Sequence, residues 1–252
     1  MTGQHRWTAQ AVLFDLDGVL VDSMPLISTL LDRWADLHGL DRALVHRTAH
    51  GRREAELAAE LVPSCDPEEQ VALMQGWQLT EFDGCRPCPG AAELIERLDP
   101  RQWAVVTSGS GPVARGRLRA AGLPTPRTMI TADDVVRGKP DPEPYLRAAA
   151  ELGVPGARCV VVEDAPSGAA AGLAAGMRLI AVADAGAAWP DALEGPVVRV
   201  ASLERVAVVG VGPAPVDLLI GTDGGPRSGG GTDGGPPDRN RTGTGPLTGD
   251  GT

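Results

Sequence analysis

Short apolar runs alternate along this chain with segments in which apolar residues recur every three or four positions. The runs predict buried strands, at 11–14, 103–107, 128–131, 159–163, 179–182 and 197–200. The periodic segments predict helices at 90–98, 112–121, 143–152 and 166–175, and a short segment follows at 202–209. Because strands and helices alternate, we predict an α/β fold with a Rossmann-like, doubly wound parallel sheet as its core.

Residues 23–88 depart from this alternation, because no strand pattern interrupts their helical spacing. Pro25 suits the first turn of a helix, and Gly39 suits the C-terminal cap of the same helix. Further helical patterns follow at 53–62 and 67–80. The pattern predicts an all-helical domain inserted directly after the first strand.

The last part of the chain has a different composition. Glycine, proline, threonine and aspartate dominate beyond residue 213, and the hexapeptide Gly-Thr-Asp-Gly-Gly-Pro occurs twice. A segment with so few apolar residues cannot offset its ordering entropy, so we expect 213–252 to be a disordered tail. The expected domains are a core of 1–22 and 89–212 and a helical insertion of 23–88.

The composition limits the partners and the compartment. A net charge of −10 argues against a nucleic-acid partner, since phosphate-binding surfaces are usually basic. No apolar run approaches the ~18 residues that a membrane span needs. Four cysteines do not make a disulfide framework in a chain of this size, which favours a reducing cytoplasm. We expect a cytoplasmic protein that binds neither nucleic acid nor membrane and is a monomer or a weak dimer.

The basic residues are unusually uniform. Of the 23 lysines and arginines, the only lysine is Lys139. Lysine offers a compact point charge, whereas arginine offers a wide planar fork. This bias suggests that Lys139 occupies a place that arginine cannot fill, and the alternative is that the lysine has survived by chance.

Acidic and hydroxyl side chains follow the predicted strands. Asp15 and Asp17 come directly after the strand at 11–14, Thr107 ends the second strong strand, and Glu163 and Asp164 end the third. Residues i and i+2 of a strand point to the same side, so Asp15 and Asp17 are expected to lie together at the carboxyl edge of the sheet. Two adjacent carboxylates are costly unless a cation or a shared proton relieves them. The pattern therefore suggests a divalent metal and chemistry on a phosphate.

Four short segments carry a family resemblance. They are Asp15-Leu16-Asp17-Gly18, Thr107-Ser108-Gly109, Gly138-Lys139-Pro140 and Glu163-Asp164-Ala165-Pro166-Ser167-Gly168. In this order and at these strand ends, they resemble the four motifs of the haloacid dehalogenase superfamily. The resemblance covers about residues 11–206. Within the superfamily, the core segments are most similar to bacterial sugar and hexitol phosphatases and to phosphatases of 2-deoxyglucose 6-phosphate and glycerol phosphate.

The resemblance implies roles for the core residues. Asp15 resembles the nucleophile that forms an aspartyl-phosphate, and Asp17 resembles the general acid and base. Thr107 would hydrogen-bond a phosphoryl oxygen, while Lys139 would neutralise that oxygen and keep Asp15 ionised. The backbone amides implied to share the phosphate charge are those of Leu16, Asp17 and Ser108.

The resemblance also implies Mg²⁺ as the cofactor, because hard oxygen ligands and a phosphate suit this ion. Its implied ligands are Asp15, the carbonyl of Asp17, Glu163 and Asp164. Glu163 and Asp164 also suit the start of the next helix, where acids are favoured. The two interpretations are compatible, since the same helix start is the expected metal site.

The helical insertion resembles the cap domain that closes over the site in this superfamily. His50, Gly51 and Arg52 lie at a predicted helix break, and in similar sugar phosphatases the corresponding loop faces the substrate. They are therefore candidate substrate-binding residues, and the alternative is a solvated helix start with surface charges.

The expected function is that of a Mg²⁺-dependent phosphatase. It would hydrolyse a small sugar- or polyol-phosphate monoester through an aspartyl-phosphate. Two alternatives remain. A sugar-phosphate mutase of the β-phosphoglucomutase type shares the motifs and the cap. A binding module could have kept the fold and lost turnover, although the complete motif set weighs against this.

Overall fold

A six-stranded parallel sheet lies at the centre of the computed structural model, which describes residues 3–49, 52–182, 193–209 and 215–222. The strand order is β6-β5-β2-β7-β8-β9. The strands are β2 (Ala11–Phe14), β5 (Trp103–Val106), β6 (Thr128–Ile130), β7 (Cys159–Glu163), β8 (Arg178–Val182) and β9 (Val197–Val200). All neighbouring pairs are parallel, so the predicted fold class is confirmed.

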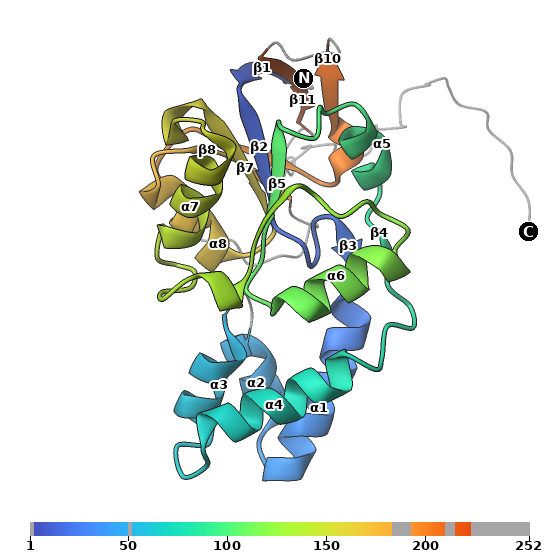
Figure 1. Cartoon of the computed structure of the whole chain (residues 1–252), viewed down its shortest axis with the longest axis vertical. Coiled ribbons are helices and arrows are strands. Elements are labelled where there is room, and N and C mark those ends of the chain that lie inside the picture. The colour runs from blue at the N-terminus through green and yellow to red at the C-terminus, as the bar shows by residue number, and fades with distance from the viewer. Residues whose placement is uncertain (1–2, 50–51, 183–192, 210–214, 223–252) are drawn as a thin grey trace, which may run out of the picture.

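Helices cover both faces of this sheet (Figure 1). They are α5 (Ala91–Glu96), α6 (Gly111–Ala120), α7 (Glu143–Leu152) and α8 (Pro166–Ala174). Figure 1 shows α7 and α8 on one face and α5 and α6 on the other. Successive residues of β2 alternate between the faces, so Phe14 packs in the cluster of Leu118, and Leu13 packs in the cluster of Tyr145. Because both faces are buried, each central strand is a continuous apolar run.

The described residues of the cap form four helices, which lie below the sheet in Figure 1. They are α1 (Met24–His38), α2 (Arg42–Ala49), α3 (Glu54–Leu61) and α4 (Pro67–Gln78). The cap has its own apolar core, which includes Trp34, Val45, Leu57 and Met74. Gly39 ends α1 with a left-handed φ of 64° and donates its N–H to the carbonyls of the last turn, as its position predicted.

The helix α2 was not predicted from the sequence. Only Val45 of its eight residues is buried, so its apolar periodicity is too weak to mark a helix. The chain enters the cap through β3 (Val21–Asp22) and leaves it through β4 (Arg86–Pro87), and these two short strands pair antiparallel. This ribbon is the covalent connection between the cap and the core.

A second, antiparallel sheet packs on the α5 side of the core. Its order is β1-β11-β10, with β1 (Gln4–Ala9), β10 (Val206–Val209) and β11 (Val216–Gly221). The prediction of a disordered tail from residue 213 is therefore wrong for β11, which pairs with β1 along its whole length. Leu218 and Ile220 of β11 are fully buried, whereas residues 223–252 of the expected tail lie outside the described residues.

Two truncations test the role of β11. Removal of residues 215–252 deletes Val216, Leu218 and Ile220 from the core, and we expect it to lower the free energy of unfolding by on the order of 5 kcal/mol. Removal of 223–252 leaves β11 intact and is the matched control. Urea denaturation of both truncated chains measures the difference, and equal stabilities would mean that β11 contributes nothing to the fold.

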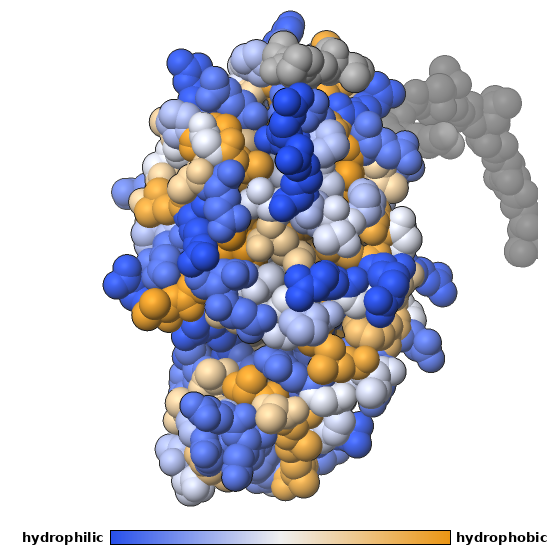
Figure 2. Space-filling model, viewed as in Figure 1, coloured by the Kyte–Doolittle hydropathy of each residue, from blue (hydrophilic) through white to orange (hydrophobic). Residues whose placement is uncertain are grey.

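The outer surface shows no single chemical character on the face drawn in Figure 2, where hydrophilic and hydrophobic residues are interspersed over the core and the cap. Among the described residues, no helix has the length and the apolar character needed to cross a membrane.

Candidate active site

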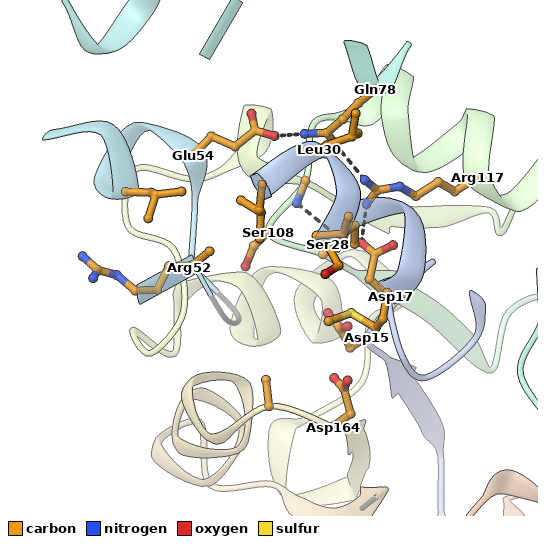
Figure 3. A pocket seen from close by; sticks show the side chains of 18 of the residues that line it. Asp15, Asp17, Ser28, Leu30, Arg52, Glu54, Gln78, Ser108, Arg117 and Asp164 are labelled. Carbon is orange, nitrogen blue, oxygen red and sulfur yellow. Dashed lines mark hydrogen bonds and ion pairs between the residues drawn. The ribbon is translucent and has the colours of Figure 1, made fainter. Parts of the chain in front are cut away.

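A cavity of about 590 Å³ lies between the carboxyl edge of the parallel sheet and the cap. Asp15 and Asp17 reach it from the end of β2, Thr107 from the end of β5 and Asp164 from the end of β7. Lys139 reaches it from the loop that precedes α7. Five side chains from four separate segments thus meet where parallel strands end. Figure 3 labels three of them, Asp15, Asp17 and Asp164.

Lys139 is the electrostatic centre of the site. Its Nζ donates to Asp15 Oδ1, to Glu163 Oε1 at 2.6 Å and to the carbonyl of Val106 at 2.9 Å, and the side chain is only 3% exposed. Burial by itself lowers the pKa of Lys139, but the carboxylates of Asp15 and Glu163 more than offset burial and raise it. An ammonium group has three donors, and all three are used here.

Glu163 is buried and fully hydrogen-bonded. Besides Lys139, its Oε1 accepts from the hydroxyl of Tyr145 at 2.7 Å. Its Oε2 accepts from the backbone N–H groups of Asp164 and Ala165, each at 3.1 Å. Gly168 is required beside it, since a Cβ there would lie 1.7 Å from Glu163 Oε1. The observed contacts make Glu163 the residue that orients Lys139, and its role as a metal ligand stays a prediction.

Three carboxylates form a group that suits a cation. Oxygens of Asp15, Glu163 and Asp164 all lie within 4.8 Å of one another. Burial, followed by the neighbouring charges, raises the pKa of Asp15 to about 7, although Lys139 acts in the opposite direction. Burial and the charges of Asp15 and Glu163 raise the pKa of Asp164 to about 9. A divalent ion would relieve this repulsion, so the donor set fits the predicted Mg²⁺.

Asp17 is held from two sides. Ser23 Oγ donates to Asp17 Oδ1 at 2.5 Å, and Arg117 donates from Nη1 to Asp17 Oδ2 at 2.7 Å. Arg117 lies on α6 and is 4% exposed. The sequence reasoning missed this arginine, although a signal was present. Val113 lies four residues before Arg117 and Ala121 lies four residues after it, and both are buried. The helical period therefore predicts an apolar residue at position 117, where the sequence has an arginine.

The comparisons with known proteins agree with this geometry. A family model described as haloacid dehalogenase-like hydrolase matches residues 9–176. The chain belongs to the haloacid dehalogenase-like hydrolases. The match covers the segment from β2 to the end of α8 and includes all four motifs, and the predicted family is confirmed.

Named relatives support the same assignment. Hexitol phosphatase A of Escherichia coli is 43% identical over 68% of this chain and 81% of that protein. Glycerol-1-phosphate phosphohydrolase 2 of Saccharomyces cerevisiae is 36% identical over 69% of this chain and 74% of that protein. A haloacid dehalogenase family hydrolase of Deinococcus radiodurans, solved with bound phosphate and sodium, is 32% identical with a TM-score of 0.51 and covers 73% of this chain and 85% of that one.

The remaining core motif residues of this hydrolase lie at the same sheet edge. Thr107 Oγ accepts from the backbone N–H of Gly109 at 3.1 Å, a hydrogen bond typical of a hydroxyl in a turn, while the residue also lines the cavity. Ser108 lines the cavity as well. The side chain of Leu16 is buried in the core, so only its backbone is available for the implied contact with phosphate.

The predicted cap residues are only partly described. Arg52 lines the cavity, but it pairs with Glu60 at 2.7 Å and approaches Glu56 at 3.8 Å, so its charge is already balanced within the cap. His50 and Gly51 lie outside the described residues. The contribution of all three to substrate binding stays a prediction.

The raised carboxyl pKa values predict how the stability of the metal-free hydrolase depends on pH. Between the ordinary pKa of 3.8 and the folded value of about 9, Asp164 holds more proton in the folded than in the unfolded state. Stability is then expected to fall as the pH rises through this range, and Asp15 adds to the fall up to about pH 7. Excess Mg²⁺ is expected to reverse this trend.

Thermal denaturation between about pH 5 and about pH 9, with EDTA or with Mg²⁺, measures the effect as a change in Tm. The variant Asp164→Asn is the control and should show both a flatter pH profile and a smaller response to Mg²⁺. If Mg²⁺ raised the Tm of the wild type and of Asp164→Asn equally at every pH, Asp164 would not belong to the cation site.

Proposed function

We propose that this hydrolase is a Mg²⁺-dependent phosphatase that releases inorganic phosphate from a small sugar- or polyol-phosphate monoester. The observation that carries the proposal is the meeting of Asp15, Asp17, Lys139 and Asp164 at one wall of the cavity. The named activities of the two relatives add support, as does the phosphate bound to the Deinococcus structure.

The side chains divide the chemistry between them. A carboxylate oxygen of Asp15 attacks phosphorus, and Lys139 stabilises the negative charge that gathers on the phosphoryl oxygens. Asp17 gives its proton to the departing alkoxide, so that the free alcohol leaves and an aspartyl-phosphate remains. Asp17 then takes a proton from water, which attacks phosphorus, releases phosphate and restores Asp15. Mg²⁺ held by Asp15, Asp164 and the Asp17 carbonyl would supply further neutralisation of the phosphate charge.

The cavity suits a small substrate that is uncharged apart from its phosphate. The cap contributes apolar side chains to the cavity wall, among them Ile27, Leu30, Leu57 and Met74. Among its described residues, the polar side chains that it contributes are Ser28, His46, Arg52, Glu54 and Gln78. Apolar walls with a few polar groups can hold the carbon chain of a sugar or polyol and hydrogen-bond its hydroxyls.

The charge pairing in the cavity favours a phosphatase over a mutase. A sugar-phosphate mutase must hold a second phosphate away from the nucleophile. Within the described part of the cavity wall, the basic groups outside the phosphate site are already paired: His46 with Asp32, Arg52 with Glu60 and Arg117 with Asp17. A second phosphate would have to break one of these pairs.

A phosphate-release assay with Mg²⁺ tests the proposal. The panel contains hexitol 6-phosphates, glycerol 1-phosphate, 2-deoxyglucose 6-phosphate and hexose 1-phosphates, the last with and without a hexose bisphosphate. Free phosphate from at least one ester is the expected result. Isomerised ester without free phosphate would identify a mutase. A folded protein that is inactive on every ester would leave the binding module as the remaining hypothesis.

A further inference from the structure

Arg117 contacts the core and the cap at the same time. One terminal nitrogen of its guanidinium, Nη1, donates to Asp17 of the core. The other, Nη2, donates to Oε1 of Gln78 at the end of α4, at 2.9 Å. The Nε of Arg117 is buried and has no hydrogen-bond partner among the described residues, so these two contacts hold the group.

The contacts continue into the cap. The side-chain amide of Gln78 donates to a carboxylate oxygen of Glu54, at the start of α3. Figure 3 shows the resulting chain of hydrogen bonds, which runs from Glu54 through Gln78 and Arg117 to Asp17 along the cavity wall. It joins two cap helices to the loop after β2 by way of one core helix.

We propose that Arg117 is a positioning residue for Asp17, and that Gln78 of the cap keeps Arg117 in place. The inference rests on the proposed function, because it assigns a task to the side chain that handles the proton. It adds to that function Arg117 of α6, which lies outside the four motifs. It also adds the contact between Gln78 and Arg117, through which the cap acts on the carboxylate of Asp17.

The geometry explains why a guanidinium occupies this position. The carboxylate of Asp17 sits at the end of a turn and can rotate about its side-chain bonds. Ser23 fixes one of its oxygens and Arg117 fixes the other, which leaves a single orientation. A planar fork can donate to two acceptors in fixed directions at once, which a lysine ammonium cannot do with the same geometry.

The consequence for the reaction depends on the leaving group. A polyol alkoxide is strongly basic and needs the proton of Asp17 as the P–O bond breaks. A p-nitrophenolate is a weak base and leaves without it. Loss of the orientation of Asp17 should therefore slow transfer from a polyol phosphate much more than transfer from p-nitrophenyl phosphate. A loss of general packing would slow both reactions equally.

The test compares kcat/KM for sorbitol 6-phosphate and for p-nitrophenyl phosphate, since this ratio reports the steps up to departure of the leaving group. For Arg117→Met, the loss on sorbitol 6-phosphate is expected to exceed the loss on p-nitrophenyl phosphate by at least about 10-fold. Arg117→Lys should recover part of the difference. Arg119→Met, an exposed position on the same helix, is the control and should match the wild type on both substrates.

A second variant separates positioning from folding. Gln78→Leu leaves the core intact but removes the cap partner of Arg117, the hydrogen bond to Glu54 and one polar group of the cavity wall. A smaller selective loss on sorbitol 6-phosphate is therefore expected in kcat, whereas a lost substrate contact alone would raise KM. Equal losses on both substrates in Arg117→Met and in Gln78→Leu would overturn the proposal and make the pair structural. A folded wild type that releases phosphate from neither substrate nor from any ester of the panel above would instead refute the proposed function, and this inference with it.

Discussion

Asp15→Asn is expected to lower phosphate release by about 10⁴-fold or more, while the protein stays folded. The amide of asparagine cannot form the bond to phosphorus that the carboxylate forms. Its shape is nearly the same, and Lys139 keeps its contacts with Glu163 and with the carbonyl of Val106. The loss should therefore appear in kcat and not as a loss of structure.

Steady-state phosphate release together with circular dichroism measures this outcome. Asp83→Asn is the matched control, because it makes the same chemical change at an exposed position in the connection from the cap to the core. Acid quenching of the wild type during turnover, followed by peptide mass spectrometry, should locate the phosphoryl group on Asp15. Turnover of Asp15→Asn within about tenfold of the wild type would remove Asp15 from the nucleophilic role.

Lys139→Met is expected to impair both the reaction and the fold. The substitution leaves Asp15 and Glu163 buried next to each other without their shared cation. Breaking a buried ion pair in this way costs about 3–5 kcal/mol of stability, and phosphoryl transfer loses its nearest positive charge. Lys139→Arg should not restore the activity, because three acceptors surround a single nitrogen and leave no room for a planar fork.

Urea denaturation and phosphate release separate the two effects. The double variant Lys139→Met/Glu163→Gln removes one of the unpaired charges, so it should regain part of the stability but none of the activity. Because Lys139 is the only lysine, an amine-directed reagent mapped to this residue should react in urea and not in the native protein. If the free energy of unfolding of Lys139→Met were within about 1 kcal/mol of that of the wild type, Lys139 would not be a buried partner of both carboxylates.

Local sequence patterns were sufficient for the central sheet and for the ends of its strands. The strands buried on both faces are continuous apolar runs, and the reactive residues directly follow them. A parallel sheet brings all its carboxyl ends to one edge, so Asp15, Thr107 and Asp164 could be placed together without knowledge of the packing. Lys139 was recognisable because it is the only lysine among the 23 lysines and arginines of the chain.

Elements that depend on distant partners were missed. The strand β11 lies at the start of a segment whose composition predicts disorder, and its partner β1 is separated from it by about 200 residues. The helix α2 buries a single side chain against the rest of the cap. The helix α2 has no strong periodic pattern of its own, whereas in β11 the buried residues Val216, Leu218 and Ile220 alternate along the strand. That alternation was missed because the composition of the whole segment after residue 213 predicts disorder.

The sequence by itself determined the fold class, the family and the residues that meet at the end of β2. Each of these depends on residue type and order along the chain. Only the tertiary structure showed that Glu163 accepts hydrogen bonds from Lys139 and Tyr145. It also showed that Arg117 donates to Asp17 of the core and to Gln78 of the cap. These contacts connect residues from about 20 to 100 positions apart, and a hydrogen bond over such a separation forms only after helices and strands have packed.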